Sequence, residues 1–587
     1  MRRDAVRAAL VFVILGAVGV RALAEVGPLP GWDSDPLAQV LPETRVTPTI
    51  SLALDTAQWL ALLAALWLWT RERAGGRWAV WGLVGLAGIG AAWAAAHGLI
   101  LPPYGAADGS ELRGNIESLH LGGAWAGAWA AGLACAVLAQ RERVRRVLAA
   151  GLLALALPLA IDGLHQYTVE HDAQVLYFEE NRAAVLANQG LEPGSSGARV
   201  YERRLVQREA VGAFGLANVY GSVLGACAAG WVVAIAAGAG IAGGSSRGGV
   251  GGEGGRGGGA RAALFATGAT AAIAGSALWL SHSRGAIVAA GFGVGLVTAA
   301  VLARRFVRRR RGALGAALGV VAVIVPLAAV AVRAAVGDRW GELSLWFRAF
   351  YIEAAGRIFA DAPVWGVGPS GFQAAYGVHK PIISPEDVAS PHSVLFDYAS
   401  TLGAGGIAAG ALVIALAALA GVAAVRGGAG EEKTDEPAPD TWRRDRLMLA
   451  AVFGLLAAWA GVMLLERPVA GPGLVLGRTA ALIAAGAVVA VVGRSAVLTP
   501  AAVAAAGLVL VAHGQIEVTP VHAGAAAWAF AVIGTAAGPG LRAIGGAGRE
   551  GESPRAADGD ADGGGRGGRG GRGGGAGGEA GRLVIVA

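Results

Sequence analysis

Apolar runs of about 20 residues recur along the whole chain, separated by short polar stretches. A helix of that length crosses a hydrocarbon core of about 30 Å. The runs lie near residues 5–24, 51–70, 78–100, 121–140, 147–166, 215–240, 262–281, 286–303, 313–334, 394–425, 446–466, 474–493, 499–516 and 522–540. This pattern predicts an all-α polytopic membrane protein with about fourteen transmembrane helices, within a range of about twelve to fourteen.

The composition supports this fold class. Of 587 residues, 55% are hydrophobic and 15% are charged, and the mean hydropathy is +0.55. A soluble protein carries about 25% charged residues. The net charge of +7 does not indicate a nucleic-acid partner, because the arginines form short clusters between apolar runs. Cys135 and Cys227 both lie inside apolar runs, which argues against a disulfide framework and a Cys-based metal site.

The arginine clusters predict the orientation of the helices. If the N-terminus is cytoplasmic, the dense clusters fall in cytoplasmic loops at 71–77, 141–146, 245–261, 304–312 and 441–446. The opposite loops are longer and mixed or acidic. The nine histidines all fall in those outer loops or at outer helix ends, at positions 97, 120, 165, 171, 282, 379, 392, 513 and 522. Histidine titrates near neutral pH, so this asymmetry favours an outer-face site that handles protons.

Composition also divides the chain into parts. Residues 1–204 hold N-terminal helices and outer loops, and residues 205–425 form a central core with a large outer loop between 335 and 393. Residues 426–445 form an acidic cytoplasmic linker, and residues 446–540 hold the C-terminal helices. We expect the Gly- and Arg-rich residues 541–587 to be a disordered tail. Residues 1–24 fit a cleaved signal peptide or a first transmembrane helix, and we favour the helix.

Two arginines at the outer face are candidates for binding a phosphate. Arg284, in SHSRGA, lies at the outer junction of two apolar runs. Arg348 lies in SLWFRAFYIEAAGRIF, whose spacing predicts an amphipathic helix at the membrane interface. A guanidinium group offers a fork of donors that matches phosphate oxygens. Each arginine, taken alone, also fits a side chain anchored at the lipid headgroups, and that alternative stays open.

His392, in ASPHSVLFDY, is a candidate general base. Pro391 precedes it and an apolar helix follows, so it lies near a helix N-terminus at the membrane surface. It either takes a proton from a hydroxyl group or serves as a capping, hydrogen-bonded histidine. His513, in VAHGQIEVTP, has Glu517 one turn on and either faces the same outer cavity or marks a helix end. The chain has no HExxH motif and no paired Cys/His spacing, so no metal site is predicted.

Four motifs follow one another along the centre of the chain. The first is GAFGLANVYG, with Phe214 and Asn218 in a G-x-F-x-x-x-N pattern. SHSRG follows, with Ser283 and Arg284, and then R-x-F-Y from Arg348, continuing to DAPVWGVGPSGF. The last is His392, before an apolar run that ends TLGAGGIAAG. In this order and topology, over about residues 205–425, they resemble the O-antigen ligase superfamily, which includes O-antigen polymerases and related outer-face glycosyltransferases.

The resemblance implies a helical fold similar to that of lipid-sugar-dependent glycosyltransferases (GT-C-like). It implies a bacterial inner-membrane enzyme that needs no metal or other cofactor. At the periplasmic face, such an enzyme transfers a glycan from an undecaprenyl diphosphate carrier to an acceptor hydroxyl on a lipid, a glycan or a protein. By motif position, Arg284 and Arg348 are expected to contact the carrier diphosphate, and His392 to assist the acceptor. We include Ser283, Asn218 and His513 as accessory residues.

This sequence also departs from the family pattern, and rival functions stay open. Ser393 follows the histidine where the family usually has asparagine, and Leu402 and Gly403 stand near the position of an acidic residue. Ligation onto an acceptor and polymerisation of repeat units use the same chemistry. A transporter or flippase for the lipid-linked glycan also needs basic groups, but near the midplane or on both faces. A third alternative is a scaffold that retains the fold without activity.

Overall fold

The computed structural model describes residues 2–24, 46–72, 77–105, 111–188, 190–245, 256–304, 306–307, 310–336, 343–384, 386–426, 445–466 and 471–547. All the regular elements in these ranges are helices. Thirteen helical stretches among them are long and apolar enough to cross a membrane. The predicted class, an all-α polytopic membrane protein, is therefore confirmed. The expected acidic linker and most of the expected Gly- and Arg-rich tail lie outside the described residues.

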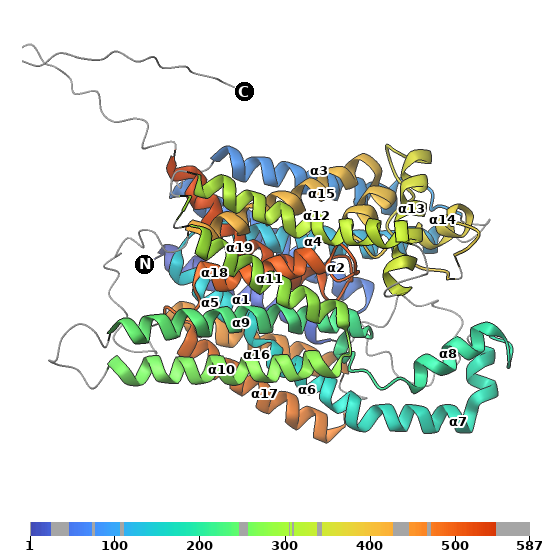
Figure 1. The fold of residues 1–587 in the computed structure, drawn as a ribbon, viewed down its shortest axis with the longest axis horizontal. Coiled ribbons are helices and arrows are strands. Elements are labelled where there is room, and N and C mark those ends of the chain that lie inside the picture. The colour runs from blue at the N-terminus through green and yellow to red at the C-terminus, as the bar shows by residue number, and fades with distance from the viewer. Residues whose placement is uncertain are drawn as a thin grey trace, which may run out of the picture. The chain divides into compact units, whose positions relative to one another are not determined.

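Most of the long helices coincide with the predicted apolar runs, and Figure 1 shows them running side by side. The bounds are α1 (Arg2–Leu23), α2 (Pro48–Arg71), α3 (Arg77–Leu99), α4 (Glu111–Leu138), α9 (Ala217–Ser245), α10 (Arg256–Leu280), α11 (Arg284–Ala303), α12 (Arg311–Val336), α15 (Val394–Arg426), α16 (Arg446–Glu466), α17 (Pro472–Val492) and α19 (Ala526–Ala547). The run at 147–166 is divided between α5 (Glu142–Ala154) and α6 (Ala156–His165). A π-helical turn at Gln166–Glu170 then leads into α7 (His171–Asn188).

Several short helices lie in the loops that we expected on the outer side. They are α8 (Ser196–Val206), a 3-10 turn at Gly212–Phe214, α13 (Leu343–Asp361) and α14 (Phe372–His379). In Figure 1, α13 and α14 lie at the same end of the bundle as α7 and α8. The helix expected around Arg348 is α13, and its buried face includes Phe350 and Tyr351.

One predicted span is wrong. The run at 499–516 forms α18 (Pro500–His513), which has 14 residues and is therefore about 21 Å long, too short to cross the hydrocarbon core. Every residue of α18 is buried, so it is a short helix inside the bundle. The following helix, α19, begins at Ala526 and continues to Ala547, beyond the boundary expected at 540. The apolar composition of these residues reflects burial in protein and not contact with lipid.

Residues 514–525, between α18 and α19, are not helical, and almost all of them are buried. We call them the buried turn segment. Non-helical backbone at this depth needs partners inside the protein, because lipid supplies none. Its carbonyls accept hydrogen bonds from Val394 N (to Gly514 O, 2.8 Å), Arg348 Nε (to Ile516 O), Tyr398 OH (to Pro520 O, 3.4 Å), Trp125 Nε1 (to Val521 O, 2.7 Å) and Arg21 Nη1 (to Ala523 O, 3.5 Å). Side chains from α1, α4, α13 and α15 therefore converge on this segment.

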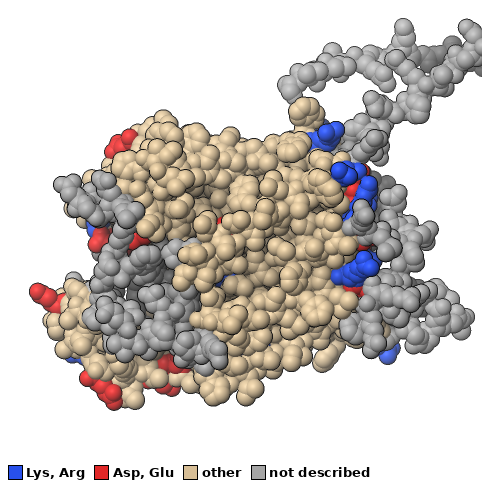
Figure 2. Space-filling view, turned by 180° about the vertical axis from the view of Figure 1, so that it is seen from behind, with Lys and Arg blue, Asp and Glu red and all other residues tan. Residues whose placement is uncertain are grey.

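Ion pairs join several helix ends at the other end of the bundle, which we call the arginine end. Two carboxylates each hold two arginines: Glu72 pairs with Arg7 and Arg141, and Asp445 pairs with Arg143 and Arg494. Figure 2 shows a broad band without charged side chains, with Lys and Arg gathered along one side of it. Among the described residues, this view agrees with the predicted gathering of arginines on one side, while parts of the predicted clusters lie outside the described residues and the assignment of that side to the cytoplasm stays a prediction.

The motif GVGPSGF docks on a break in α15. At Gly403 the backbone leaves the helical region, with φ +54° and ψ −125°. Three backbone hydrogen bonds join the two segments: Val367 N to Ser400 O (3.1 Å), Gly368 N to Thr401 O (2.8 Å) and Ala404 N to Val364 O (3.0 Å). A Cβ atom on residue 403 would lie 2.5 Å from Val364 O. Glycine is required at position 403 for two reasons. The positive φ is unfavourable for a residue with a Cβ atom, and a Cβ atom would clash with Val364 O.

The N-terminal helices hold the same loop from the other side. Trp93 Nε1 donates to Val364 O (2.8 Å), and His97 Nε2 lies 2.8 Å from Trp365 O. The rings of Trp93 and Trp365 stack with their centroids 5.1 Å apart. Residues 1–546 accordingly form one compact unit, in which the N-terminal helices support the outer loop.

We predict that Gly403→Ala lowers the free energy of unfolding by about 2–4 kcal/mol, from the left-handed backbone and the clash with Val364 O. Thermal unfolding in detergent measures this effect. Gly291→Ala in α11 is the matched control, since a Cβ there meets nothing within 4 Å. Equal melting temperatures for the two variants would show that α15 has no such break.

Candidate functional site

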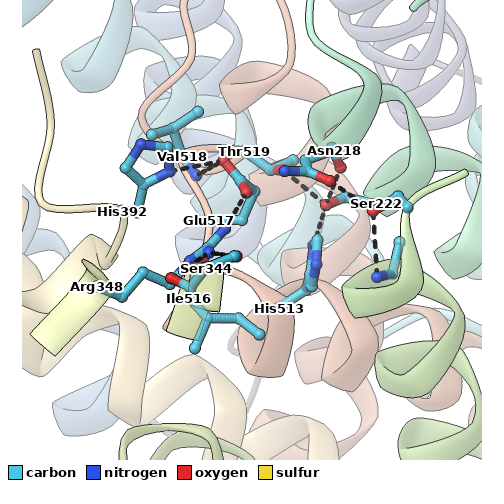
Figure 3. Close-up of polar contacts among 12 residues, drawn as sticks. Asn218, Ser222, Ser344, Arg348, His392, His513, Ile516, Glu517, Val518 and Thr519 are labelled. Atoms are coloured by element: carbon cyan, nitrogen blue, oxygen red, sulfur yellow. Dashed lines mark hydrogen bonds and ion pairs between the residues drawn. The ribbon is translucent and has the colours of Figure 1, made fainter. Parts of the chain in front are cut away.

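The carboxylate of Glu517 is the centre of a buried ionic cluster at the start of the buried turn segment. Its Oε1 lies 2.9 Å from His392 Nδ1, and its Oε2 lies 2.8 Å from Arg348 Nη2. The side chain of Glu517 is 2% exposed, that of Arg348 11% and that of His392 27%. Figure 3 shows Glu517 between His392 and Arg348. The histidine is therefore the most accessible of the three groups.

Arg348 is held by several hydrogen bonds to the protein. Besides Glu517, its Nε donates to Ile516 O, and its Nη1 donates to the Ser344 carbonyl (3.0 Å) and hydroxyl. These contacts use four of the five N–H groups of a guanidinium. Ser344 lies one turn before Arg348 on α13, so the helix itself directs the side chain toward the buried turn segment.

His392 lies in a constrained turn just before α15. Its backbone is left-handed, with φ +55°, a conformation that is uncommon for a residue with a Cβ atom. The Ser390 hydroxyl accepts a hydrogen bond from His392 N (3.0 Å) and donates one to Asp397 Oδ2 (2.9 Å). These two bonds attach the loop that holds His392 to the N-terminal end of α15. The ring of Tyr351 lies against the imidazole, with centroids 5.6 Å apart. The predicted place of His392, near a helix N-terminus, is confirmed.

The electrostatics of the cluster keep Glu517 ionised. Burial by itself raises the pKa of a carboxyl group, but the contacts with His392 and Arg348 outweigh burial and hold the pKa of Glu517 below its ordinary value. A second carboxylate, Glu386, accepts a hydrogen bond from the Tyr351 hydroxyl. Burial and this bond raise the pKa of Tyr351, so its phenol stays protonated. The cluster thus contains fixed charges around one accessible imidazole.

A second cluster of polar side chains, which we call the second polar group, lies beside the buried turn segment. Its members are Asn218, Ser222, Ser283, His513 and Thr519. His513 Nδ1 is hydrogen-bonded to the Ser222 hydroxyl, which also accepts from the Thr519 hydroxyl (2.8 Å). The Ser283 hydroxyl donates to Asn218 Oδ1 (2.8 Å). Asn218 and Ser222 are four residues apart on α9, and Ser222 donates back to Asn218 O (2.9 Å). Figure 3 shows Asn218, Ser222 and His513 on the opposite side of Glu517 from His392.

Arg284 begins α11 directly after Ser283, which is the N-cap of that helix and accepts from Ala286 N (3.4 Å). The Arg284 side chain is exposed. The next residue, Gly285, packs on His513, since a Cβ there would lie 2.9 Å from His513 Nε2. The start of α11 therefore places Arg284 close to the second polar group.

Phe214, from the first sequence motif, also reaches the buried turn segment. Its ring meets the His522 ring edge-on, with centroids 5.9 Å apart. Burial lowers the pKa of His522 to about 4, so this histidine is neutral at physiological pH. Residues from the four predicted motifs thus gather around one segment that lies after all of them in the chain.

The structure joins the predicted site residues in two groups. Arg348 and His392 meet on Glu517, whereas Ser283, Asn218 and His513 belong to the second group, with Arg284 beside Ser283. The central role of Glu517 and the contacts of Ser222 and Thr519 were not predicted. A signal for Glu517 was present, because it is the only acidic residue between Glu466 and Glu550 in an apolar region. An ionisable residue in such a region usually has a function and a partner.

Among the described residues, no group of three or more His, Cys, Asp or Glu side chains is arranged to hold a metal ion. A guanidinium beside an imidazole suits a substrate that combines an anion with a hydroxyl group.

A comparison with protein families matches residues 269–427 to a family described as O-antigen ligase. The matched range contains Arg284, Arg348 and His392, and the predicted family resemblance is confirmed there. Phe214, Asn218, His513 and Glu517 lie outside the range. No curated protein and no solved structure matches the chain, so the predicted GT-C-like fold stays a prediction.

We predict that His392→Gly is more stable than His392→Ala by about 1 kcal/mol, because glycine adopts a left-handed conformation without strain. Both variants lose the same side-chain contacts, so thermal unfolding in detergent isolates the backbone effect. Arg357, exposed within α13, is the control position: there the alanine variant is the more stable by about 0.5–1 kcal/mol. The same order at both positions would contradict a left-handed residue 392.

Proposed function

We propose that this multi-pass membrane protein is a glycosyltransferase, because residues 269–427 match the O-antigen ligase family. It transfers a glycan from a polyprenyl diphosphate carrier, of the undecaprenyl type, to a hydroxyl group of an acceptor. The acceptor is a lipid, a glycan or a protein. The observation that carries this proposal is the meeting of Arg348 and His392, 44 residues apart in the chain, at Glu517.

The imidazole of His392 is the proposed general base. Its Nδ1 faces Glu517, so Nε2 is the ring nitrogen that faces a substrate. Nε2 takes the proton of the acceptor hydroxyl as the acceptor oxygen forms a bond to the anomeric carbon of the sugar. The bond from that carbon to the diphosphate oxygen breaks, and its electron pair leaves with the diphosphate. Attack opposite the leaving group inverts the anomeric centre, and the imidazolium afterwards gives its proton to water.

The two arginines are the proposed ligands of the diphosphate. Fixed positive charge stabilises the negative charge that grows on the leaving group, without any reorganisation during the reaction. Arg284 is exposed at the start of α11, directly after the N-cap Ser283. Arg348 has one N–H beyond its four bonds to the protein. Because Arg284 is exposed whereas the Arg348 side chain is only 11% exposed, we assign most of the diphosphate affinity to Arg284 and a smaller part to Arg348.

We propose the periplasmic face of a bacterial inner membrane as the location of this reaction. The arginine end carries the clusters that the positive-inside rule assigns to the cytoplasm. Helix α11 runs from Arg284 at the site to Ala303, which is followed by Arg304, and α15 runs from Val394 at the site to Arg426. The site and the arginine clusters thus lie at opposite ends of the same helices.

Polymerisation of repeat units uses the same donor and the same bond changes, with a second glycan as the acceptor. A flippase is the rival of a different class, and it requires charged groups along a path across the membrane. The candidate residues of this chain gather at one end of the bundle instead.

We predict that the purified protein releases polyprenyl diphosphate from a lipid-linked glycan when an acceptor extract is present, and that release continues in EDTA. His392→Ala lowers kcat by about 100- to 10,000-fold, because the base is lost. Arg284→Ala raises the KM for the donor, and Arg348→Ala lowers kcat by about 100-fold. Release in nanodiscs, followed by mass spectrometry, measures each effect.

Arg357→Ala is the matched control, because Arg357 lies on the same helix as Arg348 but is exposed and pairs with Glu353. Its activity is expected to equal that of the unchanged protein. Unchanged release in the variants of Arg284, Arg348 and His392 would refute the site. Movement of the intact lipid-linked glycan across a proteoliposome bilayer, without release of carrier, would favour the flippase.

A further inference from the structure

We propose that Glu517 is the positioning residue of His392, and that the C-terminal helices thereby complete a site whose other members come from the matched domain. The inference rests on the proposed function of His392 as a general base. Glu517 does not contact the substrate in this proposal. It acts by orienting the imidazole and by stabilising the imidazolium that forms when the acceptor proton is taken.

The geometry fits this role. Glu517 Oε1 lies 2.9 Å from His392 Nδ1, so an ionised carboxylate accepts a hydrogen bond from Nδ1–H. That bond selects the tautomer in which Nε2 carries a lone pair, which is the form that a general base needs. The exposure of the two side chains agrees, since Glu517 is 2% exposed and His392 is 27% exposed. The carboxylate lies behind the ring and the accessible part of the ring is left for an acceptor.

Two further contacts prevent Glu517 from turning away from His392. Oε2 is paired with Arg348 Nη2 (2.8 Å), and Oε1 also accepts from Val518 N (3.1 Å). Arg348 in turn is anchored on Ser344 and Ile516. Both carboxylate oxygens are therefore fixed, which holds the imidazole in one orientation in the absence of substrate.

The surrounding charges keep the carboxylate available for this purpose. Around Glu517 and His392 lie the titratable or charged groups of Arg348, His513, His522, Asp397 and Tyr351, and Glu386 accepts a hydrogen bond from Tyr351. Among these, Arg348 supplies a permanent positive charge at 2.8 Å. It favours the ionised form of Glu517, and an ionised partner is what a newly formed imidazolium requires.

Glu517 lies outside the matched family region in the chain. The matched family region ends at residue 427, and Glu517 follows it by 90 residues, beyond α16, α17 and α18. The buried turn segment brings it back to the domain, where Gly514 O accepts from Val394 N (2.8 Å) beside His392. The matched domain without the C-terminal helices would lack the group that orients its base.

The test is Glu517→Gln in the full-length protein, with release of polyprenyl diphosphate from a polyprenyl-diphosphate-linked glycan as the assay. Glutamine keeps the shape but removes the charge. We expect kcat to fall by about 10- to 100-fold because the base is misplaced, while the KM for the donor changes much less, because Arg284, the main proposed donor ligand, is not in contact with Glu517. Glu353→Gln, on the exposed part of α13, is the matched control and is expected to change neither constant.

A double-mutant cycle separates positioning from general support of the fold. If Glu517 acts through His392, the loss in kcat from Glu517→Gln disappears when His392 is already asparagine. Equal losses in both backgrounds would overturn the inference. Since Glu517→Gln leaves Arg348 without its counter-charge and can impair folding, Glu517→Asp is the second variant. It keeps the charge but withdraws it from Nδ1, so kcat falls and the KM for the donor is preserved.

The release assay tests the role of Glu517 separately from the glycosyltransferase activity. If the unchanged protein releases carrier but Glu517→Gln and Glu517→Asp both retain full kcat, the function stands and the role of Glu517 is refuted. If the unchanged protein releases no carrier, the proposed function fails and this inference fails with it. Loss of kcat in both Glu517 variants, with no further loss in the asparagine background, supports both.

Discussion

The buried turn segment imposes the constraint on which the rest of this structure depends. Residues 514–525 leave the helical conformation inside the bundle, where neither lipid nor bulk water provides hydrogen-bond partners. An unsatisfied buried carbonyl costs about 1–3 kcal/mol, so each one requires a donor from elsewhere. Arg21, Trp125, Arg348 and Tyr398 supply these donors from four different helices. The requirement fixes how the N-terminal, central and C-terminal helices meet.

The same requirement assembles the candidate site. Arg348 satisfies a carbonyl of the segment through Nε and pairs with Glu517 through Nη2, so one side chain serves both the fold and the chemistry. Burial of the ionised Glu517 carboxylate has a large desolvation free energy, and the contacts with Arg348 and His392 offset it. A cluster of this kind adds little net stability compared with apolar packing. Its presence at the accessible end of the bundle therefore indicates a functional role more than a structural one.

Helix prediction from hydropathy succeeded for long apolar runs, both where the helix is mostly exposed on the bundle (α11) and where it is mostly buried in it (α15), and it failed for one run of similar hydropathy. The runs that became α11 and α15 were placed to within a few residues, because about 20 apolar residues in a row have few other stable outcomes. The run at 499–516 looked the same but is a short buried helix followed by irregular backbone. Hydropathy measures how unfavourable the exposure of a side chain to water is, and it does not distinguish a lipid environment from a protein interior.

The sequence by itself determined the membrane class, the gathering of arginines at one end, and the candidates Arg284, Arg348 and His392, since these depend on composition and local motifs. The tertiary structure alone decided that Arg348 and His392 meet on Glu517, and that His513 joins Ser222 rather than Glu517. The reason is physical: a contact between residues more than 100 positions apart depends on how helices pack and on which buried groups need partners. Neither the packing of the helices nor the partners of the buried polar groups can be read from a short stretch of the chain.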